Sequence, residues 1–133
     1  MQKLTMAICQ QIINRVVEKT AADGGRPVAV AVCDQEGFLV ALLKMDGVPT
    51  RCVHFARHKA YTAARMQTRT DAFYDRLQQE NLDISYFCDP VLTPLPGGAP
   101  IVTEDGTVIG SVGISGRPSS EDQQLAIMAA RIE

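Results

Sequence analysis

The chain has 133 residues, of which 46% are hydrophobic and 21% are charged, values typical of a folded protein with an apolar core. Its net charge of −2 and its lack of Trp argue against nucleic-acid binding, which depends on a basic excess and on stacking side chains. No apolar run approaches the roughly 20 residues that span a bilayer, and the first residues do not form a signal-peptide pattern. We therefore expect one cytoplasmic domain over residues 1–133, with no nucleic-acid or membrane partner.

The four cysteines include no C-x-x-C pair, so neither a structural zinc site nor a thioredoxin-type redox pair is expected. Cys9, Cys33 and Cys52 lie in apolar segments and are predicted to be small buried side chains. Cys88 lies in a loop segment and is predicted to be exposed; an inert free thiol there is more common than a reactive one.

The first half of the sequence predicts a helix and a hairpin. Apolar residues recur at a spacing of four over residues 5–22, with Thr5 as the N-cap and Gly24 as the end of the helix. The next two apolar runs, 28–33 and 38–45, flank a short turn and predict a β-hairpin.

The second half predicts a helix over about 50–67 and a shorter one directly after it. Residues 81–98 are the least regular stretch, and the runs 99–103 and 107–115 predict a second hairpin. A final helix follows, with Ser119 as its expected N-cap. Hairpins imply antiparallel pairing, so the expected class is α+β, with helices packed on one antiparallel sheet.

The helix over 50–67 has two distinct faces when it is placed on a helical wheel. The small or apolar face carries Cys52, Val53, Ala56, Ala60, Ala63 and Ala64. The polar face carries His54, Arg57, His58, Tyr61 and Arg65. We expect the small face to pack closely on the sheet, so the polar face points away from it.

His54 and His58 are four positions apart, so their rings can meet on one turn of the helix. This spacing can hold a divalent metal or offer an imidazole to haem iron or corrinoid cobalt. The alternative is two solvated histidines on an exposed face. With the small face on the sheet, a ligand site here would need a second subunit to close it.

Two further features could bind a ligand. Residues 51–76 carry a net charge of +4 whereas the rest of the chain is negative, which suits a small anion bearing carboxylates or phosphate; ordinary solvated side chains are the alternative. Gly97 and Gly98 lie between prolines, in a stiff loop that could approach a ligand closely or could simply be a structural turn. The glycines within 110–116 are expected to let another part of the chain pack closely on a strand.

Four segments, in order along the chain, are distinctive in combination. They are Met45-Asp46-Gly47, Lys59-Ala60-Tyr61-Thr62-Ala63, Pro96-Gly97-Gly98-Ala99-Pro100-Ile101 and Ile109-Gly110-Ser111-Val112-Gly113-Ile114-Ser115-Gly116. With the surrounding pattern, they resemble the GlcG/HbpS/PduO C-terminal family of haem-binding-type domains. The resemblance implies a profilin-like three-layer α/β/α sandwich around a five-stranded antiparallel sheet, homo-oligomers and, in some members, a bound haem or corrinoid. It also carries over Lys59, Gly97 and Gly98 as candidate site residues.

The leading hypothesis is a small non-enzymatic accessory protein that binds a tetrapyrrole, haem or cobalamin, and supports B12-dependent metabolism of diols or glycerol. In it, His54 or His58 supplies an axial nitrogen, Arg57 and Lys59 meet the acidic side groups, and the double-glycine loop shapes the pocket. One alternative is a small enzyme acting on a carbonyl or hydroxy-acid metabolite, with Lys59 as acid or base. Another is a structural subunit that docks on a dehydratase or adenosyltransferase.

Overall fold

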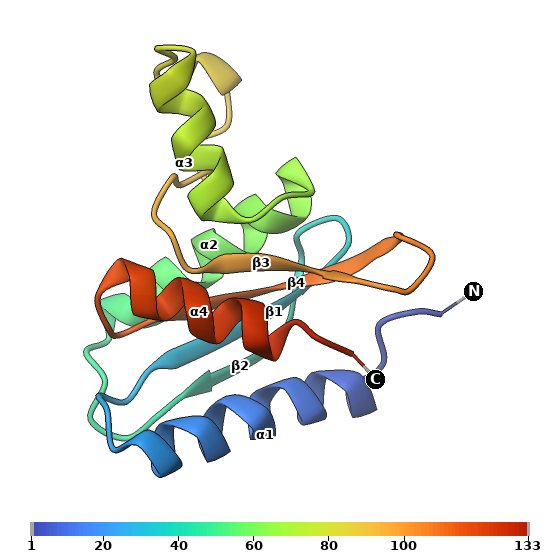
Figure 1. Ribbon diagram of the computed structural model, residues 1–133, viewed down its shortest axis with the longest axis vertical. Coiled ribbons are helices and arrows are strands. Elements are labelled where there is room, and N and C mark those ends of the chain that lie inside the picture. The colour runs from blue at the N-terminus through green and yellow to red at the C-terminus, as the bar shows by residue number, and fades with distance from the viewer. Residues whose placement is uncertain (1, 133) are drawn as a thin grey trace.

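The structure is a computed structural model that describes residues 2–132 and has an α+β fold (Figure 1). Its elements are α1 (Met6–Asp23), β1 (Ala29–Asp34), β2 (Leu39–Lys44), α2 (Arg51–Met66), α3 (Thr70–Gln79), a 3-10 turn η1 (Ile84–Phe87), β3 (Gly98–Val102), β4 (Val108–Ser115) and α4 (Ser119–Ala129). The strands form one sheet in the order β2-β1-β4-β3, and every neighbouring pair is antiparallel. The predicted class and both predicted hairpins are therefore confirmed.

The number of strands differs from what the family resemblance implied. The part of the chain that the structure describes contributes four strands to the sheet, so the expected five-stranded sheet is wrong. The long segment between α3 and β3 forms only η1 and turns. Pro90, Pro94 and Pro96 lie in this segment and have no N–H to donate to a neighbouring strand. The profilin-like arrangement stays a prediction.

Helix α1 begins and ends as the sequence predicts. The Thr5 side chain accepts a hydrogen bond from the Ile8 N–H at 3.2 Å, which satisfies one of the free amides at the start of the helix. Gly24 ends the helix in the left-handed conformation, with a φ of 67°.

Helix α4 begins differently from the prediction, and Ser119 is not its N-cap. Pro118 holds that position, and its carbonyl accepts from the N–H groups of Glu121 and Asp122. The Asp122 carboxylate accepts from the Arg117 N–H at 3.0 Å. An acidic side chain inside the first turn therefore binds the chain that enters the helix, and no serine cap is formed.

Helices cover both faces of the sheet because the strand side chains alternate in direction (Figure 1). Alternate residues of β1 pack with α1 and α4 on one face, as Val30 and Val32 do. Ala29 and Ala31 face α2 on the other side. None of the helices within residues 2–132 has the length and apolar character of a membrane-spanning segment.

The small face of α2 packs on the sheet as predicted, since Cys52, Ala56 and Ala60 are buried against β1. Gly113 of β4 lies directly beneath this helix. A Cβ atom at Gly113 would collide with the Ala56 carbonyl oxygen and would lie 2.6 Å from the Ala60 nitrogen. The predicted role of the β4 glycines, a close approach of another part of the chain, is confirmed at this position.

Candidate functional site

Lys59 belongs to the buried side of α2, although the residues around it in sequence are mostly charged or polar. Its side chain is only 3% exposed, and its Nζ donates to the Ile114 carbonyl oxygen at 2.9 Å. The Asp122 Oδ2 of α4 lies 3.3 Å from the same Nζ, so the two residues form a buried ion pair. Burial lowers the pKa of Lys59, and the charge of Asp122 opposes that shift. Burial raises the pKa of Asp122.

The double-glycine loop packs directly against Lys59. A Cβ at Gly97 would lie 2.7 Å from the Lys59 Nζ, and one at Gly98 would collide with the Lys59 carbonyl oxygen. Gly97 also has a φ of 135°, which a residue with a side chain rarely adopts. Gln123 holds the loop, since its Oε1 accepts from the Gly97 N–H and its Nε2 donates to the Gly98 carbonyl oxygen. The structure therefore brings Lys59, Gly97 and Gly98 together.

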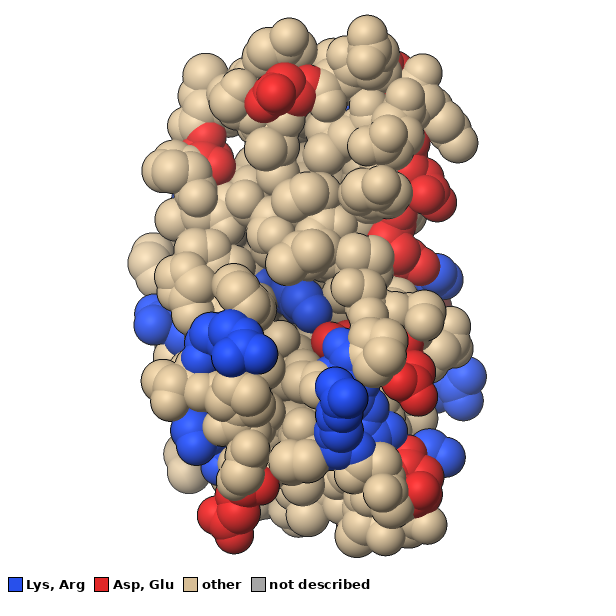
Figure 2. Space-filling model, turned by 90° about the vertical axis from the view of Figure 1, so that its left-hand side faces the viewer, with Lys and Arg blue, Asp and Glu red and all other residues tan. Residues whose placement is uncertain are grey.

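A cleft of about 610 Å³ lies beside the Lys59–Asp122 pair, where α2 and α4 both begin. Lys59, Asp122 and the side chains of Arg26 and Arg51 line it, and Phe55 adds an apolar wall. Figure 2 shows blue Lys and Arg side chains gathered about a hollow on the corresponding face of the molecule. We refer to this feature as the cationic cleft. Its lining suits an anionic ligand.

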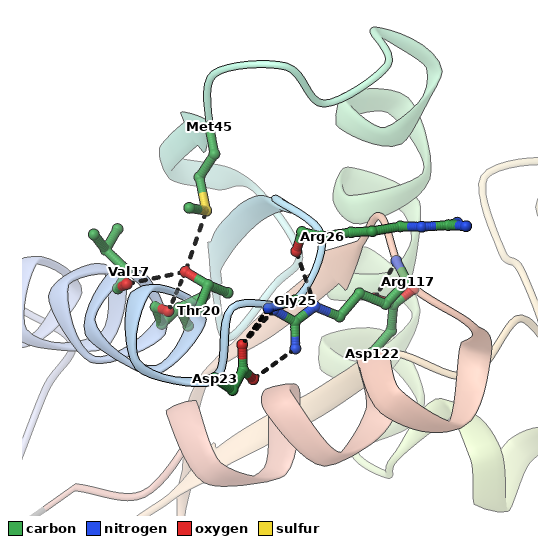
Figure 3. Close-up of polar contacts among 9 residues, drawn as sticks. Val17, Thr20, Asp23, Gly25, Arg26, Met45, Arg117 and Asp122 are labelled. Atoms are coloured by element: carbon green, nitrogen blue, oxygen red, sulfur yellow. Dashed lines mark hydrogen bonds and ion pairs between the residues drawn. The ribbon is translucent and has the colours of Figure 1, made fainter.

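Arg117 fixes one wall of the cationic cleft by binding the end of α1. Its guanidinium donates to both carboxylate oxygens of Asp23, at 2.8 and 2.9 Å, and its Nε donates to the Arg26 carbonyl oxygen (Figure 3). The side-chain hydrogen bonds from Arg117 hold the pKa of Asp23 well below its usual range. The Arg26 side chain extends away from this ion pair (Figure 3). The Arg117 charge is thus neutralised, and Arg26 keeps its own.

The two histidines lie on the outward face of α2 and do not line the cationic cleft. The rings of His54 and His58 are 4.1 Å apart between centroids, so the predicted meeting of the two rings on one turn is confirmed. His54 and Arg57 are exposed, and His58 is half-buried. Burial lowers the pKa of His58, and the positive charges of His54 and Arg57 lower it further. His58 therefore favours its neutral form, which is the form that binds metals.

The candidate residues predicted from the sequence thus divide into two groups. His54, Arg57 and His58 form an outward group on α2, which we call the histidine face. Lys59, Gly97 and Gly98 form an inward group beside the cationic cleft. In residues 2–132, no group of three or more His, Cys, Asp or Glu side chains is placed to hold a metal ion.

Sequence reasoning missed the roles of Arg26 and Asp122 in the cleft. Asp122 lies in the first turn of α4, where acidic side chains are common, and nothing local links it to Lys59, which is 63 positions away. Arg26 follows a glycine pair in a turn, a position where a charged side chain is usually solvated.

The fold is that of a small α+β domain with a cationic cleft beside a buried ion pair. The chain belongs to the HbpS-like family of haem degrading proteins, whose family model matches residues 4–131. The match covers every helix and strand described above.

Similarities to curated sequences and to solved structures support the same family assignment. The chain is 32% identical to protein GlcG of Escherichia coli over 116 residues, which cover 85% of this chain and 84% of GlcG. A crystal structure of a double mutant of Streptomyces reticuli HbpS is 31% identical, with a TM-score of 0.85 and coverage of 98% of this chain and 86% of that one. The crystal structure of a PduOC–haem complex is 25% identical, with a TM-score of 0.84 and coverage of 97% and 94%.

Proposed function

We propose that this protein is a small accessory protein that binds haem, with the histidine face of α2 as the site of the iron ligand. The family description and the haem in the PduOC complex support haem as the ligand. The observation that carries the assignment to this face is the His54–His58 pair, whose rings lie 4.1 Å apart on an accessible surface. These are the two histidines of the chain, and imidazole nitrogen is a common axial ligand of haem iron.

The residues of this face fit the chemistry of the group. His58 keeps a lone pair for iron because its lowered pKa favours the neutral imidazole. Arg57 is exposed, lies three positions after His54 on the same helix, and offers a guanidinium to an acidic side group of the porphyrin. A bound haem would supply an iron centre for redox or oxygen chemistry. This chain would supply the axial nitrogen and a positive charge opposite the acidic side groups of the porphyrin, and it would orient the haem.

A second copy of the chain would complete such a site, because the histidine face is open on a single copy. Strand β2 is an edge of the sheet, and it exposes apolar side chains next to Phe38, which is 69% exposed. Val40 and Leu42 are 47% and 40% exposed. An apolar strand edge with free backbone groups favours pairing with another chain. These observations support the homo-oligomer that the family resemblance implies.

A visible-spectrum titration with haem tests the proposal. The wild type is expected to give a saturable Soret shift at micromolar haem, and the His54→Ala/His58→Ala variant is expected to lose it. A matched control removes Gln10 and Asn14, an exposed polar pair with the same spacing on α1, and should bind as the wild type does. An unchanged shift in the histidine variant would contradict the assignment to this face.

Cobalamin is the second tetrapyrrole to titrate. A corrin-band shift that depends on the same histidines would favour the predicted role in B12-dependent diol or glycerol metabolism. Haem binding without cobalamin binding would favour a haem-linked role. The predicted docking to a dehydratase or adenosyltransferase stays a prediction, and a salt-sensitive pull-down would test it.

A small metabolite enzyme that uses Lys59 is the second candidate. The buried Lys59–Asp122 pair at the edge of the cationic cleft favours it, because burial lowers the pKa of the ammonium toward the range useful for proton transfer. The Lys59→Met variant would then lose turnover of a carbonyl or hydroxy-acid substrate at a temperature below its lowered unfolding transition, where its circular dichroism spectrum is still native. Turnover that survives this change would exclude Lys59 as the acid or base.

A further inference from the structure

The cationic cleft carries two positive charges that no acidic side chain of the described residues neutralises. Lys59 is paired with Asp122, and Arg117 is paired with Asp23. In residues 2–132, neither Arg26 nor Arg51 forms a salt bridge, and both side chains are exposed at the cleft. The cleft therefore has a net charge near +2 at its mouth.

The backbone adds to this positive potential. Arg51 is the first residue of α2 and Ser119 is the first residue of α4, and both line the cleft. The N-terminus of each helix carries the positive end of its helix dipole. Two such N-termini on one cleft reinforce the two guanidinium groups.

The inner wall of the cleft supplies one more donor. An ammonium group has three N–H bonds, and two of those on Lys59 go to Ile114 and Asp122. The third has no partner in the part of the chain that the structure describes. Phe55 and Leu95 line the same cleft, so the space offers apolar surface as well as positive charge.

We propose that the cationic cleft is a binding site for a small organic dicarboxylate. Arg26 and Arg51 balance its two negative charges, since a guanidinium fork matches the two oxygens of a carboxylate. Lys59 donates its remaining N–H to a carboxylate oxygen, and the carbon body of the ligand lies against Phe55 and Leu95. This site is separate from the histidine face, and the inference rests on neither haem binding nor turnover.

Titration calorimetry and amide chemical shifts at low ionic strength test this inference with three probes. Succinate carries two carboxylates, butyrate has the same four-carbon chain with one, and inorganic phosphate, in a buffer above its second pKa, is mainly a dianion without a carbon body. We expect succinate to bind saturably and to shift the amide signals of Arg26, of residues 51–59, and of residues 115–122 other than Pro118. Butyrate makes one charge-assisted contact fewer than succinate, so its affinity should be lower by about tenfold or more. Phosphate that binds as tightly as succinate would overturn the dicarboxylate assignment.

The variants use exposed residues so that the fold is retained. Arg26→Ala/Arg51→Ala should weaken succinate about tenfold or more. The control Lys44→Ala/Arg76→Ala removes the same charge from exposed positions outside the cleft and should bind succinate as the wild type does. Equal succinate affinity in the Arg26→Ala/Arg51→Ala variant and in the wild type would overturn the site. The absence of saturable amide chemical-shift changes at millimolar succinate would also overturn the site.

The haem titration distinguishes failure of this inference from failure of the proposed function. The Arg26→Ala/Arg51→Ala variant should bind haem with wild-type affinity if the two sites are separate. If that variant loses haem and the histidine variant does not, haem occupies the cationic cleft. That result would overturn both the dicarboxylate assignment and the histidine-face assignment.

Discussion

Lys59 and Asp122 form an ion pair between two helices that lie on opposite faces of the sheet. Lys59 belongs to α2, which packs on the Ala29–Ala31 face, and Asp122 belongs to α4, which packs on the other. Both side chains are 3% exposed. The pair therefore links the two helical layers directly, beyond the contacts that each makes with the strands.

Breaking this pair should destabilise the fold strongly. Lys59→Met and Asp122→Asn should each lower the free energy of unfolding by about 3–5 kcal/mol, because each leaves one buried polar or charged partner uncompensated. The Lys59→Met/Asp122→Asn variant should lose much less than the sum of the two single changes. Urea denaturation of the three variants measures this. Additive losses would mean that the two groups do not interact.

Adding a methyl group beneath α2 should lower the free energy of unfolding. In Gly113→Ala, the new Cβ meets the backbone of Ala56 and Ala60, which cannot move without shifting the helix. We expect a loss of about 3 kcal/mol or more in thermal or urea unfolding. Gly106→Ala is the control, since nothing lies within 4 Å of its Cβ position, although its φ of 87° still adds a strain of about 1–2 kcal/mol. Equal losses at the two positions would contradict the close approach.

The stability of the protein should depend on pH through His58. Its pKa is lowered from the ordinary 6.5, so the unfolded state binds more protons than the native state in the window just below pH 6.5. The free energy of unfolding should therefore rise with pH through that window and fall as the solution is acidified. In the His58→Gln variant, the slope of the free energy of unfolding against pH should be smaller over that window. A slope that is the same in both proteins would rule out His58 as its source.

Haem affinity should also depend on the protonation of His58. Protonation of His58 removes the lone pair that would bind iron, so the Soret shift should weaken as pH falls below the ordinary histidine range. The titration compares wild type with His54→Ala, which retains His58. If affinity does not vary with pH in either protein, His58 is not the iron ligand.

The four thiols should differ sharply in reactivity. Cys88 is exposed, whereas Cys9, Cys33 and Cys52 are buried. Burial, with a contribution from Asp34, raises the pKa of Cys33 to about 12. A chromogenic thiol reagent at neutral pH should label one thiol per native chain and four after unfolding. Cys88→Ser should remove the native signal; a remaining fast thiol would contradict the burial of the other three.

The edge strand β2 should support self-association. Leu42→Lys places a charge on its exposed apolar surface and should shift the protein toward monomers in sedimentation analysis. The control is Gln79→Lys, an exposed position on α3. A wild type that is monomeric throughout the measured concentration range would disprove the proposed oligomer.

The sequence pattern was enough to predict most of the fold. Apolar spacing and the Thr5 and Gly24 signals placed α1 within a residue or two, and two short turns identified both hairpins. The start of α4 was misplaced because a serine after proline is a common cap, whereas the Pro118 carbonyl and the Asp122 side chain make the bonds here. The expected fifth strand came from family resemblance and not from any β run in the chain.

The site was only partly predictable. A helical wheel correctly separated the histidine face from the small face of α2, because both are set by local spacing. Lys59 was not recognised as buried, since its burial depends on a partner in α4. The cationic cleft joins Arg26 and Arg51 to the start of α4, and only the tertiary fold brings these segments together.

The central position of β1 has a consequence for how the chain is made. It pairs with β2 across a short turn, but its other neighbour is β4, where Ala31 pairs with Gly113 and Cys33 with Ser111. Until β4 has left the ribosome, the nascent β1–β2 hairpin has neither its second partner strand nor the cover of α4, and a lone hairpin is barely stable. The core therefore assembles only after β4 has emerged, and a chain stopped before β4 would expose apolar strands to aggregation.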